Sequence, residues 1–133
     1  MRNQLYYIAE GELNFVKQQV NTRDNIWIVE IDGNDILTWE DYAIKMEKAF
    51  QFPTPCDKSM DAYIDWMTDL SWLNVSGYVL FIKNYQSFMK DDIEKKEKVI
   101  WFFKEDILPF WESGITQYVV NGIAKPFNVY LVV

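Results

Sequence analysis

Acidic side chains recur every four residues in the segment 55–73, PCDKSMDAYIDWMTDLSWL, where Asp61, Asp65 and Asp69 stand. A further acid of interest, Glu105, follows in a later charged segment. Paired carboxylates can perform acid–base catalysis when their environments differ, and carboxylates can hold a magnesium ion. A row of carboxylates can also imitate the phosphates of a nucleic-acid strand and enter the basic cleft of a nuclease. The groups that accompany the acids decide between these chemistries.

Those accompanying groups argue against catalysis and metal binding. The chain has no histidine and one cysteine, Cys56, so neither a Ser–His or Cys–His nucleophile nor a Cys/His zinc site can form within it. No glycine-rich phosphate loop is present. The acids Asp91, Asp92 and Glu94 lack the spacing of a calcium loop and are interpreted as a solvated helix start. We therefore expect no enzymatic activity, no cofactor and no metal, and protein binding is left for the acidic row.

The overall charge is consistent with a basic protein partner. The formal net charge is -7 and the pI is about 4.5, which makes nucleic acid and anionic membranes poor partners. A plain acidic domain with no such partner would have the same composition. The single cysteine fits a reducing compartment, and the sequence shows neither a signal-peptide core nor an apolar run long enough to span a membrane. A cytoplasmic location is expected.

Three apolar segments separated by helical patterns must position the acids. IWIVEIDG (26–33), GYVLFIKNY (77–85) and PFNVYLVV (126–133) indicate buried strands, and the spacing predicts a small parallel sheet covered by helices in a single domain, 1–133. Residues 4–20 could form a hairpin, with LYYI and LNFV on either side of AEGE, or their second half could start a short helix. Residues 110–125 are predicted to be irregular or partly helical.

Three helices are predicted between the strands. The first begins at Thr38, whose side chain can form a capping box with Asp41, and stops near Pro53. The last covers 93–108, is ended or kinked by Pro109, and turns a set of apolar residues inward. Those residues are Ile93, Ile100, Phe103 and Ile107.

The middle helix carries the acidic row. It begins near Asp57 or Ser59 and has a broad apolar face with Trp66 on the core side. Like charges four residues apart mildly destabilise such a helix. The apolar face comprises Met60, Tyr63, Ile64, Met67 and Leu70, and the opposite face comprises Asp61, Asp65, Thr68, Asp69 and Trp72.

Several of these pieces, in this order, resemble the barstar family of ribonuclease inhibitors. The matching pieces are EIDG (30–33), FP (52–53), SMDAYIDWM (59–67), VLFIKNY (79–85), VIWFFKED (99–106) and PFNVYLVV (126–133). The resemblance covers residues 26–133 and leaves 1–24 as an N-terminal extension. It implies an α/β fold with a three-stranded parallel sheet, no enzymatic activity, and one-to-one blocking of a ribonuclease active site, as in an immunity protein that neutralises a toxin.

The resemblance also implies which residues touch the partner. Asp61 and Asp65 match the two helix aspartates that insert into the nuclease, and Glu105 matches the acid of the last helix. The family's loop tyrosines and glycine are replaced by Pro55, Cys56 and Asp57, and this change leaves open a barstar-like interaction module with a non-nuclease target. The remaining candidate contact residues are Pro55, Asp57, Ser59, Ile64, Asp69 and Trp72.

Overall fold

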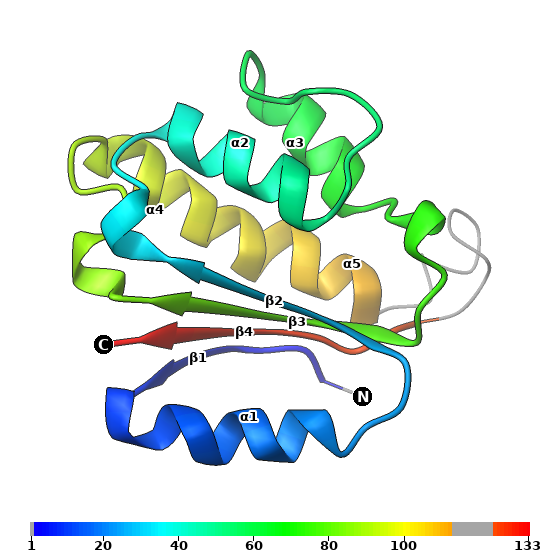
Figure 1. The fold of residues 1–133 in the computed structure, drawn as a ribbon. Helices are drawn as coiled ribbons and strands as arrows, with labels where there is room; N and C mark the ends of the chain where they lie inside the picture. Colours follow the sequence, from blue (N-terminus) through cyan, green and yellow to red (C-terminus); the bar gives the residue numbers. More distant parts are fainter. Residues whose placement is uncertain (1, 113–123) are drawn as a thin grey trace.

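Four parallel strands form the sheet in the computed structural model, which describes residues 2–112 and 124–133. The strands are β1 (Leu5–Ile8), β2 (Ile26–Asp32), β3 (Gly77–Lys83) and β4 (Phe127–Val132), arranged in the order β1-β4-β3-β2 (Figure 1). The expected α/β class with a barstar-like parallel sheet is confirmed, and the sheet has one strand more than the three expected.

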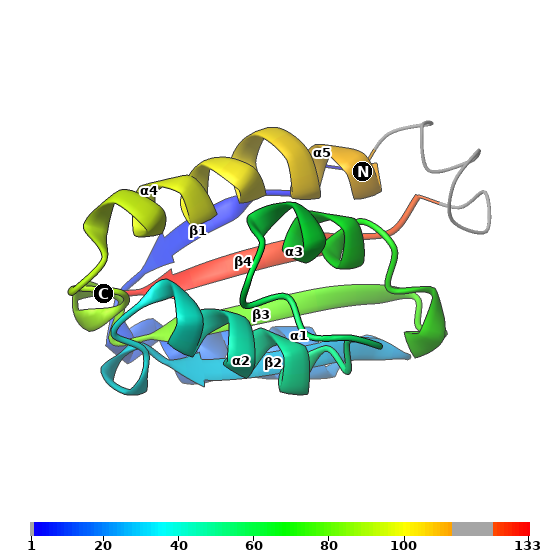
Figure 2. The same cartoon turned by 90° about the horizontal axis from the view of Figure 1, so that it is seen from above.

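Helices cover both faces of this sheet. The helix α1 (Leu13–Asn21) lies on one face, while α2 (Trp39–Ala49), α3 (Met60–Met67), α4 (Ile93–Phe102) and α5 (Leu108–Glu112) lie on the other (Figure 1). Seen from above, α3 lies between α2 and the α4–α5 pair (Figure 2). We call α2 to α5 the helical layer. Short 3-10 turns occupy Glu10–Glu12, Gly33–Asp35, Ser71–Leu73 and Tyr85–Ser87.

Alternation along the strands divides the apolar side chains between two cores. Leu80 and Val129 point to the large core under the helical layer, while Val79 and Phe81 point to a small core under α1. All but the last residue of β3 are buried, because this strand is central and covered on both faces. The apolar runs of the sequence correctly indicated these strands.

Of the two alternatives for the N-terminal segment, the second is confirmed, because its second half forms a helix and not a hairpin strand. Residues 5–8 form β1, which pairs in parallel with β4, and α1 follows it. Asn128 Oδ1 accepts a hydrogen bond from the Gln4 amide at 2.9 Å, and the Tyr6 ring stacks on Tyr130 with centroids 5.0 Å apart. This pairing was missed because its partner lies more than a hundred residues away, where local pattern carries no information.

The last helical segment also differs from its prediction. Ile93, expected to face inward, is 52% exposed, whereas Ile100, Phe103 and Ile107 are buried as expected. The helix runs through Pro109 to Glu112, with a π-helical turn at Phe103–Ile107 just before the proline. Proline lacks the amide that would bond to the carbonyl four residues earlier, and a widened turn is one way a helix accommodates it.

The helix with the acidic row is shorter than the pattern suggested. It ends at Met67, and Leu70 adopts a left-handed conformation with φ of 51° before a 3-10 turn begins at Ser71. Residues 110–112 are helical, as the partly helical expectation allowed, and the remainder of that segment up to residue 123 lies outside the described residues.

Candidate partner-binding surface

Helix α3 begins where the sequence predicted and presents two of its acids to solvent. Ser59 is the N-cap, and its Oγ accepts a hydrogen bond from the Ala62 amide at 3.2 Å. Asp61 lies in the first turn, where the helix dipole favours a negative charge. Asp61 and Asp65 are exposed, while Tyr63 between them is fully buried. The two carboxylates therefore project from one exposed face, about one helical turn apart.

Both ends of α3 are held by indole groups from neighbouring helices. Trp39 of α2 donates from Nε1 to the Asp57 carbonyl at 2.9 Å, just before the helix. Trp111 of α5 donates from Nε1 to the Met67 carbonyl at 2.9 Å, at the last residue of the helix. Because both rings are buried, these bonds fix the helix relative to α2 and α5.

A buried tyrosine pair fixes the middle of the same helix. The hydroxyls of Tyr42 and Tyr63 lie 2.6 Å apart and share a hydrogen bond, and their rings meet edge to face. Burial raises the pKa of both phenols, so both stay protonated at neutral pH. The helical spacing placed Tyr63 on the apolar face but gave no sign of this polar contact, because the partner lies on another helix.

The loop before α3 packs inward through Cys56. This side chain is 1% exposed, and burial together with the negative charges of Glu47 and Asp57 raises the pKa of its thiol to about 11. Pro55 and Ser59 are exposed, and half-buried Asp57 lies 3.9 Å from the Lys58 ammonium in a pair open to solvent. Pro55, Asp57 and Ser59 thus border the acidic face, while Cys56 serves packing.

The polar groups just after α3 make hydrogen bonds within the chain, a local exposed one at Asp69 and a partly buried one at Trp72. Asp69 is half-buried and accepts a hydrogen bond from the Ser71 amide at 3.2 Å. Trp72 donates from Nε1 to the Phe50 carbonyl at 2.8 Å and packs edge to face on Trp66, with centroids 5.4 Å apart. Trp66 is half-buried and packs against the large core. The polar groups of Asp69 and Trp72 are therefore used within the fold.

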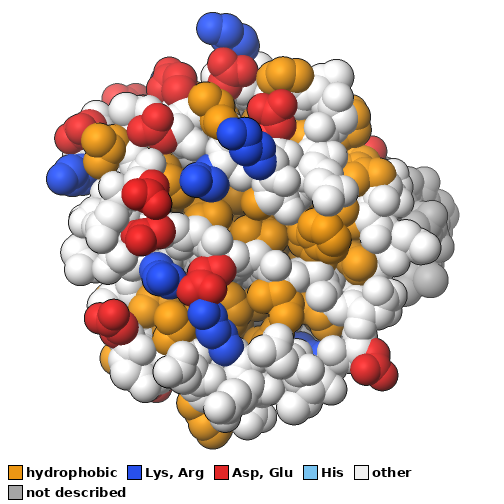
Figure 3. Space-filling model, viewed as in Figure 1, with side chains coloured by type: hydrophobic (Ala, Val, Ile, Leu, Met, Phe, Trp, Pro, Cys, Tyr) orange, Lys and Arg blue, Asp and Glu red, His pale blue; other side chains and the backbone are white. Residues whose placement is uncertain are grey.

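The continuous helical segment formed by α4, the π-helical turn Phe103–Ile107 and α5 lies next to α3 in the helical layer (Figure 2). Glu105 sits in the π-helical turn and is exposed, while its neighbour Asp106 is half-buried. Ile64, the remaining candidate, is half-buried and packs against the large core. The fold thus brings the α3 acids and the Glu105 segment into one layer (Figure 2). On the face seen in Figure 3, acidic side chains lie among lysine or arginine side chains.

The acids near residue 92 have a structural use. Asp92 Oδ2 accepts a hydrogen bond from the Trp39 amide at 3.0 Å, at the start of α2. Within the described part of the chain, no group of three or more potential ligands is placed to hold a metal ion. In those same residues no helix is long and apolar enough to cross a membrane.

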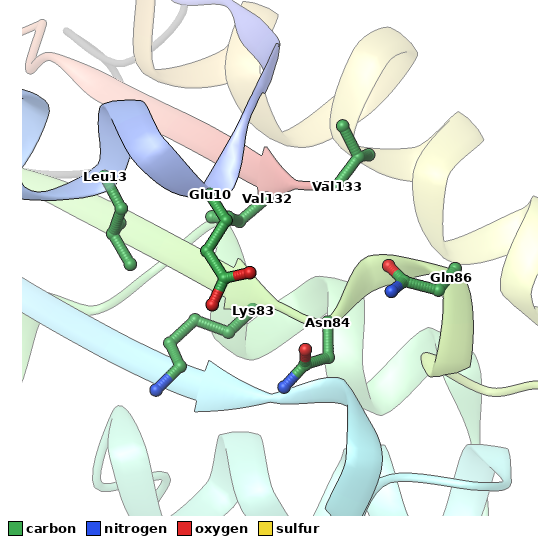
Figure 4. A pocket seen from close by; sticks show the side chains of 7 residues that line it. All are labelled: Glu10, Leu13, Lys83, Asn84, Gln86, Val132 and Val133. Carbon is green, nitrogen blue, oxygen red and sulfur yellow. The ribbon is translucent and has the colours of Figure 1, made fainter.

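A depression lies where the parallel strands end, which is the usual place for ligands in α/β folds (Figure 4). Its lining includes Lys83 at the end of β3, Asn84 just after it, and Val132 at the end of β4. Its volume is about 30 Å³, comparable to that of one water molecule. This space is too small for an organic ligand, so the described ends of these strands provide no ligand site.

Together these features define a small α/β domain that displays an acidic helix fixed at both ends. The barstar (barnase inhibitor) family model matches residues 26–121, and the chain belongs to this family. Searches of curated proteins and of solved structures gave no match. Members of the family are inhibitor proteins without enzymatic activity, so the expectation of a non-enzyme is confirmed.

Proposed function

We propose that the protein is an inhibitor or immunity protein that binds one-to-one to a bacterial ribonuclease toxin inside the producing cell and blocks its active site with α3. Family membership supports a barnase-inhibitor-like role. The observation that carries the finer proposal is the pair of exposed carboxylates, Asp61 and Asp65, on a helix held at both ends. Neither carboxylate has an ion pair among the described residues, so both are available to a partner.

The geometry suits recognition of a basic cleft. A nuclease active site holds arginine and lysine side chains for phosphate groups, and carboxylates can accept the same charge-assisted hydrogen bonds. Residues four apart on a helix have Cβ atoms about 6 Å apart, so Asp61 and Asp65 can engage neighbouring cations. Like-charge repulsion between them is relieved when those cations arrive. The fixed helix loses little conformational freedom on binding, which favours affinity.

A second candidate function keeps the surface and changes the target. Buried Cys56 and exposed Pro55 stand where the resemblance implies a loop with two tyrosines, so the aromatic part of the surface is absent from this loop. This difference favours a barstar-fold interaction module whose partner is not a nuclease. The product of an adjacent toxin gene is the first partner to test, and its absence would favour the second function.

The decisive experiment measures affinity for that nuclease by titration calorimetry, and inhibition by RNA cleavage. Asp61→Asn and Asp65→Asn should each weaken binding at least 30-fold, about 2 kcal/mol, because each leaves a cation unpaired in the nuclease cleft. Binding should also weaken with added salt. Asp24→Asn is the matched control, since it removes the same charge from an exposed turn outside the helical layer.

The control variant should bind like the wild type. Equal affinities for Asp61→Asn, Asp65→Asn and Asp24→Asn would show that overall charge alone matters and would refute the α3 plug. Tight binding to the nuclease without inhibition of RNA cleavage would refute active-site blocking and favour the interaction module.

A further inference from the structure

The edge strand β1 lacks the usual protection of a sheet edge. Edge strands commonly carry charges or proline that discourage pairing with another chain, but β1 reads Leu-Tyr-Tyr-Ile. The amides of Val129 and Val133 donate to the carbonyls of Gln4 and Ile8, at 3.1 and 2.9 Å, so the even-numbered peptide groups of β1 face β4. The backbone N–H and C=O groups of Leu5 and Tyr7 therefore point away from the sheet.

Exposed apolar side chains concentrate at this same edge. Tyr6, Tyr7, Ile93 and Trp101 are 37%, 57%, 52% and 54% exposed. Tyr7 and Ile93 line one depression of about 410 Å³ together with Glu97, and Trp101 follows Glu97 by one turn on the same face of α4. Tyr7, Ile93 and Trp101 lie on the α4 side of this edge, whereas Tyr6 stacks on Tyr130 on the α1 side. Exposed apolar side chains gathered in this way favour an interaction site.

A second depression, of about 210 Å³, lies at the other end of β1 and is lined by Leu5, Arg2 and Lys104 among others. The two depressions thus follow the strand on the side of α4 and α5, which are coloured yellow and orange in Figure 2. We call the two depressions together the β1 groove. Its strand side carries the outward peptide groups of Leu5 and Tyr7, which have no backbone partner among the described residues, and its helix side carries Ile93, with Trp101 farther along α4.

The charges of this groove differ between its two ends. At the Tyr7 end, Lys96 is engaged internally, since its Nζ donates to the Tyr85 carbonyl at 3.3 Å and lies 4.4 Å from that ring's centroid, which leaves Glu97. At the other end, Glu112 accepts a hydrogen bond from a backbone amide, which leaves Arg2 and Lys104. The Tyr7 end therefore presents the exposed carboxylate of Glu97 beside the Lys96 ammonium, and the other end presents Arg2 and Lys104 beside the Glu112 carboxylate.

We propose that the β1 edge is the interface with a second copy of this chain, in which the two β1 strands pair antiparallel across a two-fold axis. A two-fold at Tyr6 places Leu5 opposite Tyr7 of the second copy, so that their outward peptide groups bond. The same operation places Glu97 against Arg2 and Lys104 of the other copy and brings the Trp101 side chains toward the axis. An isologous interface of this kind is the commonest form of homo-oligomer.

This interface leaves the proposed nuclease-binding surface free. Helix α3 lies over the middle of the sheet, and the α4–α5 pair separates it from the β1 edge (Figure 2). Each copy in the dimer could therefore still present Asp61 and Asp65. Dimer formation is independent of nuclease binding, so either proposal can fail without the other.

Sedimentation equilibrium of the full chain over a range of concentrations tests the interface. The wild type should dimerise with a Kd of about 10 µM or lower. Tyr7→Lys should weaken dimerisation at least tenfold, because each lysine then lies opposite the apolar Leu5 of the other copy and near its Arg2 and Lys104. Phe15→Ser is the matched control: Phe15 is 65% exposed on α1, so its removal should leave the Kd unchanged.

Charge reversal distinguishes this interface from any other self-association. Glu97→Lys should weaken dimerisation by placing like charges together, and adding Lys104→Glu to it should restore dimerisation. A chain that stays monomeric throughout would overturn the proposal and leave the groove to an extended segment of another protein. A dimer unaffected by Tyr7→Lys and Glu97→Lys would place the interface elsewhere and would overturn it as well. Circular dichroism confirms that each variant is folded.

Discussion

The two faces of the sheet are covered in different ways. Under the helical layer, aromatic rings interlock and four indole groups, from Trp27, Trp39, Trp72 and Trp111, each donate to a backbone carbonyl. Under α1, the buried residues are Val20, Val79 and Phe81. The face that carries the candidate site is thus both more thickly packed and fixed by directional bonds. We infer that α3 is fixed in position by hydrogen bonds and a large core, whereas α1 is held by a small apolar contact.

Replacing one buried phenylalanine on each face of the sheet tests this comparison with the largest expected change in the free energy of unfolding. Phe127 and Phe81 are both fully buried on strands, but Phe127 packs against the rings of Phe50, Tyr78 and Phe103, whereas Phe81 has one ring contact, with Tyr130. Phe127→Ala should lower the free energy of unfolding by about 4 to 5 kcal/mol and Phe81→Ala by about 3 kcal/mol, because α1 can relax into the space left behind. Urea unfolding measures both, and equal losses would contradict the comparison.

The buried tyrosine pair gives an intermediate effect on the helical-layer face. Tyr63→Phe leaves the Tyr42 hydroxyl without its partner, so we expect a loss of about 1 to 3 kcal/mol in the free energy of unfolding. The double variant Tyr42→Phe with Tyr63→Phe should lose less than the single one, since no buried hydroxyl then lacks a partner.

Tyr78→Phe is the matched control for this cycle. The Tyr78 hydroxyl is buried and has no hydrogen-bond partner within the described residues, so its removal should cost little. Chemical unfolding of Tyr63→Phe, of Tyr42→Phe alone, of the double variant and of Tyr78→Phe provides the values. A double variant that loses the sum of its two single losses would show that the shared hydrogen bond does not hold α3.

The sequence predicted the framework better than the connections within it. The apolar runs at 26–33, 77–85 and 126–133 correctly indicated strands, because a strand buried on both faces leaves a local pattern. The N-cap at Ser59 was likewise predicted from adjacent residues. The pairing of β1 with β4 and the exposure of Ile93 depend on partners distant in the chain, so local pattern could not supply them.

The residues of the candidate site likewise divide into those that local pattern predicted and those that it did not. The periodicity indicated that Asp61 and Asp65 face outward, and both are exposed. Asp69 and Trp72 were assigned to the same face, yet the helix ends before them and their polar groups bond within the fold. The bonds from Trp39 and Trp111 to the ends of α3 were not foreseen, because a tryptophan at helical spacing gives no sign of which carbonyl its indole will meet.

The ion pair on the α1 face gives the smallest expected effect. Lys17 of α1 lies 2.7 Å from Glu30 of β2, and Lys83 lies 3.6 Å from the same carboxylate, with all three side chains about one-third exposed. Pairs open to solvent contribute little, so Lys17→Met should lower the free energy of unfolding by about 0.5 kcal/mol, and high salt should reduce the difference from wild type. Thermal unfolding at low and high ionic strength measures this loss of stability. Lys48→Met, at an exposed position of α2, is the control. A loss above about 2 kcal/mol would mean that α1 is fixed by this ion pair as firmly as α3 is by its indole bonds, and the contrast between the two faces would fail.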